Sequence, residues 1–117
     1  MGGVKEKYKA PDVTGKDLTP ALARDELLKC FESANREFYE ILDQPMGGEA
    51  LKQQVRQFVT GVFSQCGVSF DRPTKAGIMT AIEQCKKNAE STMGPRGASI
   101  ISEHYEEMMK LLSRLPE

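Results

Sequence analysis

The sequence predicts an all-α protein, an antiparallel up-down-up-down four-helix bundle with a flexible N-terminal arm. Four segments repeat their apolar residues at alternating steps of three and four, which places one apolar stripe on an α-helix. The connections between these segments have about six residues or fewer, a length typical of antiparallel neighbours in a bundle. None of the segments shows the strict alternation of a half-buried strand. We divide the chain into an arm of residues 1–17 and a bundle domain of residues 18–117.

The first helix is expected between Thr19 and Asp43. Thr19 is a favourable N-cap, and Pro20 suits the first helical position, where the N–H that proline lacks has no intrahelical partner. The outer face, which includes Glu26, carries more acidic than basic residues and would attract a basic partner. The apolar stripe of this helix consists of Leu27, Phe31, Ala34, Phe38 and Ile41.

The second helix is expected from Glu49 to Cys66, followed by a left-handed stop at Gly67. Gly61 lies inside this helix, and Gly77 lies inside the next one. Glycine in a helix interior costs about 1 kcal/mol relative to alanine. A close crossing of the two helices at these glycines, or a kink, would explain them. The apolar side of the second helix consists of Leu51, Val55, Phe58, Val59, Val62 and Phe63.

The third helix is expected from Pro73 to about Thr92, and the fourth follows a turn formed by Gly94–Gly97. The loop before the third helix contains Val68 and Phe70, so we expect it to plug one end of the core. The third stripe consists of Ile78, Ile82, Cys85 and Ala89, and the fourth of Ile101, Tyr105, Met108, Leu112 and Leu115.

Composition limits the functional classes. The chain has 117 residues with 16 basic and 17 acidic side chains, a balance that argues mildly against nucleic-acid binding, which needs a basic excess. No apolar run approaches the roughly 20 residues of a membrane span, and the first residues lack the apolar core of a signal peptide. Residues 1–16 of the N-terminal arm contain four lysines against Glu6 and Asp12. This arm is expected to be a frayed terminus or a tether to an acidic partner or a phosphate backbone.

Three cysteines and one histidine are the candidate metal ligands, one on each expected helix: Cys30, Cys66, Cys85 and His104. Three thiolates and an imidazole form a known zinc set. Counting about 1.5 Å per residue along alternating helices, however, places Cys30 and Cys66 low in the bundle and the other two near its top. We therefore predict no metal site and no cofactor. Thiols within helical patterns indicate reduced cysteines and a cytoplasmic location.

His104 is also the candidate acid–base group, because Glu103 and Glu107 lie near it in the sequence. Nothing in the sequence marks a nucleophile within its reach. The flank of an apolar stripe is typical of a partly buried structural histidine. We therefore predict no catalytic residue.

Arg96, Gly97 and Ser99 are the candidate anion-binding residues. They combine a guanidinium, a small residue and a hydroxyl at the expected start of a helix, where free N–H groups and the helix dipole favour a phosphate or carboxylate. The segment is not a Walker loop, since the Gly-Lys-Ser/Thr ending is missing.

The sequence thus predicts a non-enzymatic protein that acts through protein–protein interaction or self-association. We expect a protein partner or a homo-oligomer such as a dimer, and neither a membrane nor a nucleic-acid partner. One alternative is an anion or nucleic-acid binder that uses the basic arm and the Arg96 turn. A second alternative is a small enzyme or metal protein that uses His104 or a cysteine. Edge methionines, which are typical of adaptable partner surfaces, are Met46, Met79, Met93 and Met109.

Overall fold

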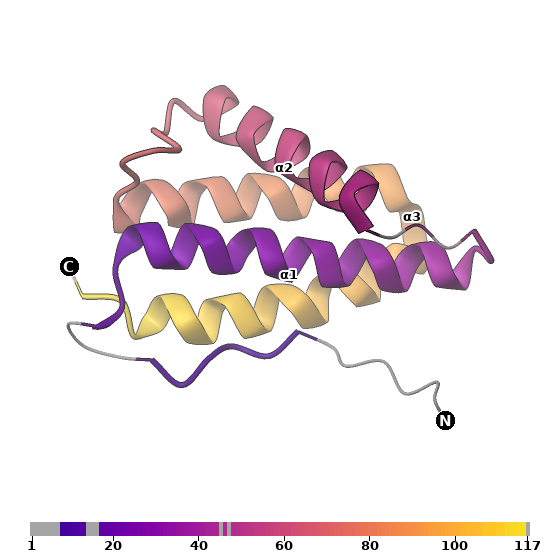
Figure 1. Ribbon diagram of the computed structural model, residues 1–117, viewed down its shortest axis with the longest axis horizontal. Helices are drawn as coiled ribbons and strands as arrows, with labels where there is room; N and C mark the ends of the chain where they lie inside the picture. Colours follow the sequence, from indigo (N-terminus) through magenta and orange to yellow (C-terminus); the bar gives the residue numbers. More distant parts are fainter. Residues whose placement is uncertain (1–7, 14–16, 45, 47, 117) are drawn as a thin grey trace.

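The computed structural model describes residues 8–13, 17–44, 46 and 48–116. These residues form three helices, α1 (Pro20–Ile41), α2 (Gly48–Gln65) and α3 (Lys75–Ser113), and contain no strand (Figure 1). The all-α prediction is therefore confirmed for the described part of the chain. No helix in that part has the length and apolar character needed to cross a membrane.

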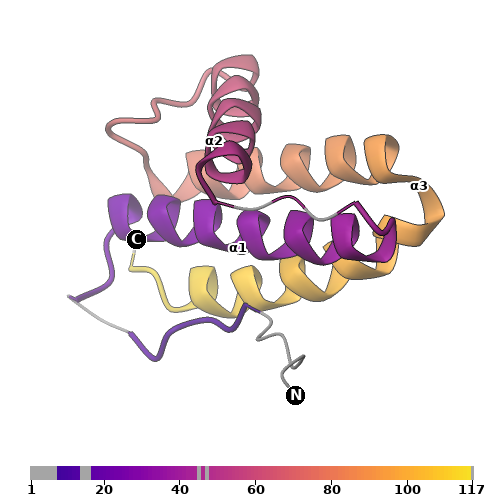
Figure 2. The ribbon, with the colours of Figure 1, turned by 45° about the vertical axis from the view of Figure 1, so that its right-hand side comes forward.

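Helix α3 reverses its direction at Gly94. This residue has non-helical backbone angles, φ 74° and ψ −167°, and Pro95 follows it. The Tyr105 hydroxyl donates to the carboxylate of Glu83, 22 residues away, which in a straight helix would lie about 33 Å distant at 1.5 Å per residue. Figures 1 and 2 show the chain doubling back at this point. We call residues 75–93 the N-terminal half of α3 and residues 95–113 its C-terminal half.

The prediction of four separate helices is not confirmed, since the described residues form three. The expected turn at Gly94–Gly97 shrinks to a single non-helical residue, because glycine accepts a positive φ and proline fits the first turn that follows. Helix α2 also departs from a parallel bundle. Figures 1 and 2 together show it crossing the other helices obliquely instead of lying along them.

Both ends of α1 are closed by local hydrogen bonds. The side chain of Thr19 accepts from the N–H of Leu22 at 3.1 Å, as expected of an N-cap. At the other end, Asp43 has a left-handed φ of 58°, and the N–H of Gln44 donates to the carbonyl of Tyr39 at 2.9 Å. This is the geometry of a Schellman end, with aspartate in the place that glycine usually takes.

We predict that Asp43→Gly stabilises the protein by about 0.5–1 kcal/mol, because a left-handed backbone is costly for a residue with a Cβ. Urea unfolding would measure the gain. Asp43→Ala is the control, since it removes the same charge and keeps the Cβ. An equal gain in both variants would mean that charge, and not backbone conformation, is responsible.

The predicted stripes form the core along most of their length. Buried residues come from all three helices and from Leu18, which is 1% exposed. In the stripe of α1, Phe38 is only partly buried. Ile41 lies 45% exposed at the last position of the helix, where the chain leaves for α2. The prediction that Ile41 belongs to the buried stripe is therefore wrong.

The loop between α2 and α3 packs against the core, as its apolar residues predict. The Phe70 ring meets that of Phe63 edge-on at 5.3 Å between centroids. The guanidinium of Arg24 lies 5.0 Å from the Phe70 ring centroid, and that of Arg56 lies 5.1 Å away. Arg24 also donates to the Phe70 carbonyl at 2.6 Å. One phenylalanine thus joins the loop to α1 and α2.

The two helix-interior glycines do not meet at a crossing. A Cβ built on Gly61 would have no atom within 4 Å, whereas one on Gly77 would lie 2.8 Å from Cγ1 of Val68. Val68 reaches this position because Gly67 ends α2 with φ 71°. The close approach therefore involves a helix and a loop, and the helix–helix crossing, one of the two explanations considered for these glycines, is wrong.

We predict that Gly61→Ala stabilises the protein by about 1 kcal/mol, the difference in helix propensity between glycine and alanine. Gly77→Ala should do the opposite, since its methyl group would collide with Val68. Thermal and urea unfolding of the two variants would check the signs. A loss of stability in Gly61→Ala would contradict the open surroundings of this residue.

Candidate functional site

The N-terminal segment of residues 8–13 lies against α1 and the C-terminal half of α3 (Figure 2). The helices hold it mainly by its main chain. The N–H of Tyr8 donates to Oγ of Ser33 at 3.1 Å, and the N–H of Ala10 donates to Oε1 of Glu107 at 3.0 Å. The carbonyl of Pro11 accepts from Nη1 of Arg114 at 2.7 Å. We call the surface formed by Glu26, Ser33, His104, Glu107 and Arg114 the arm groove.

The side chain of Tyr8 is anchored at its hydroxyl. It donates to Oε1 of Glu26 at 3.0 Å, and the other carboxylate oxygen of Glu26 accepts from Nζ of Lys29 at 3.2 Å. Burial and the Glu26 charge raise the pKa of Tyr8, so that the hydroxyl remains a donor. Glu26 is 7% exposed, which corrects its expected place on the outer face of the helix.

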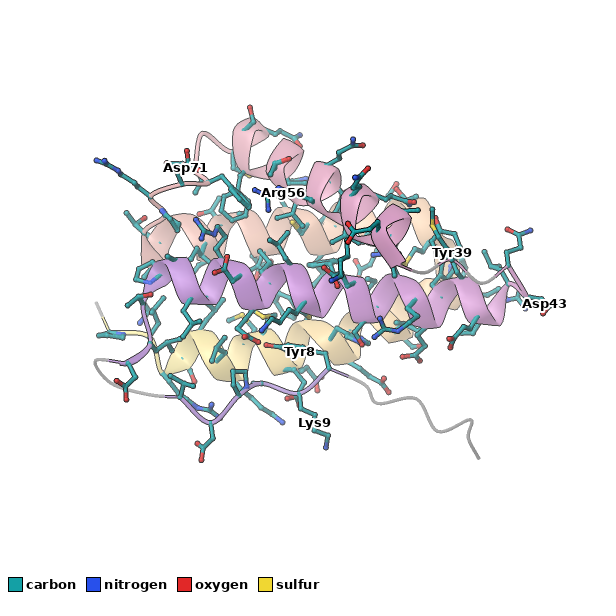
Figure 3. All side chains as sticks on the ribbon, in the orientation of Figure 1. Tyr8, Lys9, Tyr39, Asp43, Arg56 and Asp71 are labelled. Atoms are coloured by element: carbon teal, nitrogen blue, oxygen red, sulfur yellow. The ribbon has the colours of Figure 1, made fainter. Side chains whose placement is uncertain are left out.

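Figure 3 shows Tyr8 and Lys9 pointing to opposite sides of the segment. The sequence predicts a flexible arm over residues 1–17. Residues 1–7 and 14–16 of that arm lie outside the described residues, and the segment from 8 to 13 packs against the core through Tyr8, Ala10 and Val13.

His104 is a buried residue with both ring nitrogens engaged. Nδ1 lies 2.7 Å from the Ile100 carbonyl, which can only accept, so this nitrogen carries the proton. Nε2, 3.0 Å from Oγ of Ser33, then accepts from the serine hydroxyl. The side chain is 4% exposed. These contacts fit the structural histidine that the sequence predicts.

The Ser33–His104 pair has the spacing of a nucleophile and its base, although the sequence marks no nucleophile near His104. The pair is covered, since Ser33 is 7% exposed and its Oγ already accepts from Tyr8. Glu26 and Ser33 lie on the buried face of α1. The sequence does contain a signal for this placement, because both residues lie at steps of three or four from Cys30, on the face that Leu27 and Cys30 share.

The cysteines do not form the staggered set expected from the sequence. Sγ of Cys30 lies 3.4 Å from the His104 carbonyl, so the two residues stand at the same height. The prediction fails because the C-terminal half of α3 begins at residue 95, before the end of the expected turn at Gly97. His104 therefore lies further along the helix axis from the reversal than expected, at the height of Cys30. Burial raises the pKa of the Cys30 thiol, and it raises that of Cys85 to about 12. Within the described residues, no three His, Cys, Asp or Glu side chains are placed to hold a metal ion.

A second concave site lies between α1, α2 and the N-terminal half of α3, and we call it the aromatic pocket. It encloses about 110 Å³, and its apolar walls are Phe38, Val55, Phe58, Ala89 and Met93. Its polar edge consists of Asn35, Tyr39, Gln54 and Thr92.

A larger hollow of about 250 Å³ beside the arm groove is polar. It is lined by Tyr8, Lys9, Glu103, His104, Glu106 and Glu107. The hydrogen bond from Lys110 holds the pKa of Glu107 below its usual value, with the N–H of Ala10 as the next cause. Glu107 is therefore an ionised acceptor for the N-terminal segment.

The candidate anion-binding residues lie just after the reversal of α3, away from the arm groove. Arg96 and Ser99 are exposed, whereas Gly97 is buried. A Cβ on Gly97 would lie 2.3 Å from Cβ of Met93, so close packing accounts for this glycine. Anion binding by these residues stays a prediction.

Comparison with known proteins finds no matching family model, no matching curated protein and no matching solved structure. The arm groove and the aromatic pocket are therefore the features of this all-α protein that bear on its function.

Proposed function

We propose that this chain is a non-enzymatic protein-interaction module that binds an extended peptide segment in the arm groove. The observation that supports the proposal is the main-chain recognition of the N-terminal segment by Ser33, Glu107 and Arg114. A groove that bonds to peptide N–H and C=O groups gains affinity from atoms common to all extended segments.

The proposed occupant is residues 8–13 of a second copy, because this segment complements the groove in the structure. Exchange of identical segments is a low-cost route to dimers. The segment of the same chain competes at a high effective concentration, of the order of millimolar for short flexible linkers. Self-association should therefore be weak and should increase with protein concentration.

Cross-linking between copies would test this proposal. One full-length chain carries Ala10→Cys and the other Glu106→Cys, which lines the hollow beside the segment and leaves Glu107 intact. Each chain also carries Cys66→Ser to remove the half-exposed thiol. A short bifunctional maleimide should join the two chains in a yield that rises with concentration. Lys87→Cys replaces Glu106→Cys in the matched control, because Lys87 is exposed and lies outside the groove.

A chain that carries both Ala10→Cys and Glu106→Cys shows whether the linker spans the distance between these two positions. Efficient cross-linking within this chain, with no more cross-linking between copies than the Lys87→Cys control gives, would overturn the proposed exchange.

We predict that Tyr8→Phe destabilises the protein by about 1–2 kcal/mol, since the buried Glu26 carboxylate loses a hydrogen-bond donor. Urea unfolding would measure the loss. Tyr39→Phe is the matched control, because its hydroxyl accepts from Gln54 at an exposed position and its removal should cost less than about 0.5 kcal/mol. Equal losses would show that the Tyr8–Glu26 bond does not hold the segment.

The alternative functions have less support from the described residues. Lys9 stands beside Glu107, whose charge would oppose a phosphate. Both nitrogens of His104 are engaged, and burial suppresses ionisation of the Cys30 and Cys85 thiols. A catalytic role for His104 or a cysteine therefore ranks behind peptide binding, and the Arg96 anion site stays a prediction.

A further inference from the structure

The aromatic pocket lies where the N-terminal half of α2 meets α1 and the N-terminal half of α3. Two phenylalanines, Phe38 and Phe58, line it together with the thioether of Met93. The Phe58 ring packs against that of Phe31 at 5.8 Å, so the core supports this wall of the pocket. A concave apolar site with a few convergent polar groups is the usual form of a small-molecule site.

The polar edge of the pocket supplies a hydrogen-bond donor. Nε2 of Gln54 donates to the Tyr39 hydroxyl oxygen at 2.9 Å, which leaves the hydroxyl proton for another acceptor. Figure 3 shows Tyr39 near the end of α2 that lies closest to α1. Thr92 donates its hydroxyl proton to the carbonyl of Asn88 on its own helix. Tyr39 is thus suited to bind an acceptor atom of a ligand.

Size and charge restrict the ligand. A cavity of roughly 150 Å³ lined by apolar residues stays dry and binds benzene, so a pocket of about 110 Å³ admits one small ring or a short chain. None of the residues that line the pocket is charged, so an ionic ligand would lack a counter-charge there.

We propose that the aromatic pocket binds a small neutral apolar molecule that carries one hydrogen-bond acceptor, such as a ketone, an aldehyde or an ether. The apolar body contacts Phe38, Phe58 and Met93, and the acceptor takes the proton of the Tyr39 hydroxyl. This site is independent of the arm groove.

Titration of the full-length protein with cyclopentanone, followed by NMR of ¹³C-methyl methionine, would test the proposal. The Met93 resonance should shift and saturate, whereas that of Met79, which is outside the pocket lining, should not. Methylenecyclopentane is the matched ligand without the acceptor. It should bind about fivefold to tenfold more weakly, the effect of one hydrogen bond.

Tyr39→Phe should weaken binding of cyclopentanone by the same factor and leave that of methylenecyclopentane unchanged. Tyr105→Phe is the control, since its hydroxyl contacts Glu83 outside the pocket. A shift of the Met93 resonance that does not saturate would overturn the proposal. Equal affinity of the protein for the two ligands would also overturn it. A pocket filled only by a partner's side chain would give no Met93 shift with either ligand, and this result would also overturn it.

Discussion

We expect the free energy of unfolding to fall steeply as the pH rises above about 9, because two thiols are buried in the core. Cys30 is 1% exposed and Cys85 is 0% exposed. Burial is the main cause that raises the pKa of both thiols, and it raises that of Cys85 to about 12 from an ordinary value of 9.0. A thiolate would have to be desolvated at either position.

The sign of the pH dependence follows from proton binding. The unfolded chain releases the Cys85 proton near pH 9, whereas the folded chain keeps it until about pH 12. Between these values the unfolded state binds fewer protons, so stability falls as the pH rises. Each such thiol lowers the free energy of unfolding by about 1.4 kcal/mol per pH unit in this window. The stability that these groups contribute is fully present below pH 9.

Urea unfolding at a series of pH values between about 8 and 11 would measure the slope. Cys85→Ala should reduce the slope, whereas Ile41→Ala, which removes no titratable group, should not. Cys66 is only half-buried. A thiol reagent at about pH 8 should modify Cys66 and leave the other two cysteines intact until the protein unfolds. Rapid modification of all three in the folded protein would contradict this prediction and would restore the hypothesis of a reactive cysteine.

The helices and most of the core were predictable because they depend on local spacing. Thr19 and Pro20 mark the start of α1, and Gly67 marks the end of α2, through hydrogen bonds and backbone angles that involve only neighbouring residues. The single-residue reversal at Gly94 was harder to predict. Its sequence signal, a Gly-Pro pair, is the same for a four-residue turn and for a sharp bend.

The arm groove could not be predicted from periodicity. Its contacts join Tyr8 to Ser33 and Ala10 to Glu107, residues 25 and 97 positions apart. The main-chain groups of an irregular segment leave no pattern in the sequence from which their hydrogen-bond partners could be predicted. The aromatic pocket was hidden for another reason. Phe58 belongs to the predicted stripe, but the space beside it depends on the oblique course of α2, which repeats of three and four do not specify.

The largest effect of a single substitution is expected for Phe63→Ala. Phe63 is 0% exposed, and its ring supports Phe70, the residue through which the loop contacts α1 and α2. Removal of a buried phenylalanine ring costs about 3–5 kcal/mol, because transfer energy is lost and a cavity remains. Here the loop also loses the ring on which it packs.

Urea unfolding of a graded series would test this expectation. Phe70→Ala should cost less than Phe63→Ala, about 1–2 kcal/mol, because Phe70 is only half-buried and its neighbouring arginines can still cover the core. Ile41→Ala should change stability by less than about 0.5 kcal/mol, since Ile41 is 45% exposed. Both residues belong to apolar stripes predicted from the sequence, but Phe63 is 0% exposed and Ile41 is 45% exposed. If the two substitutions cost the same, α2 does not pack on the core as the structure describes, and the aromatic pocket would lose one of its three walls.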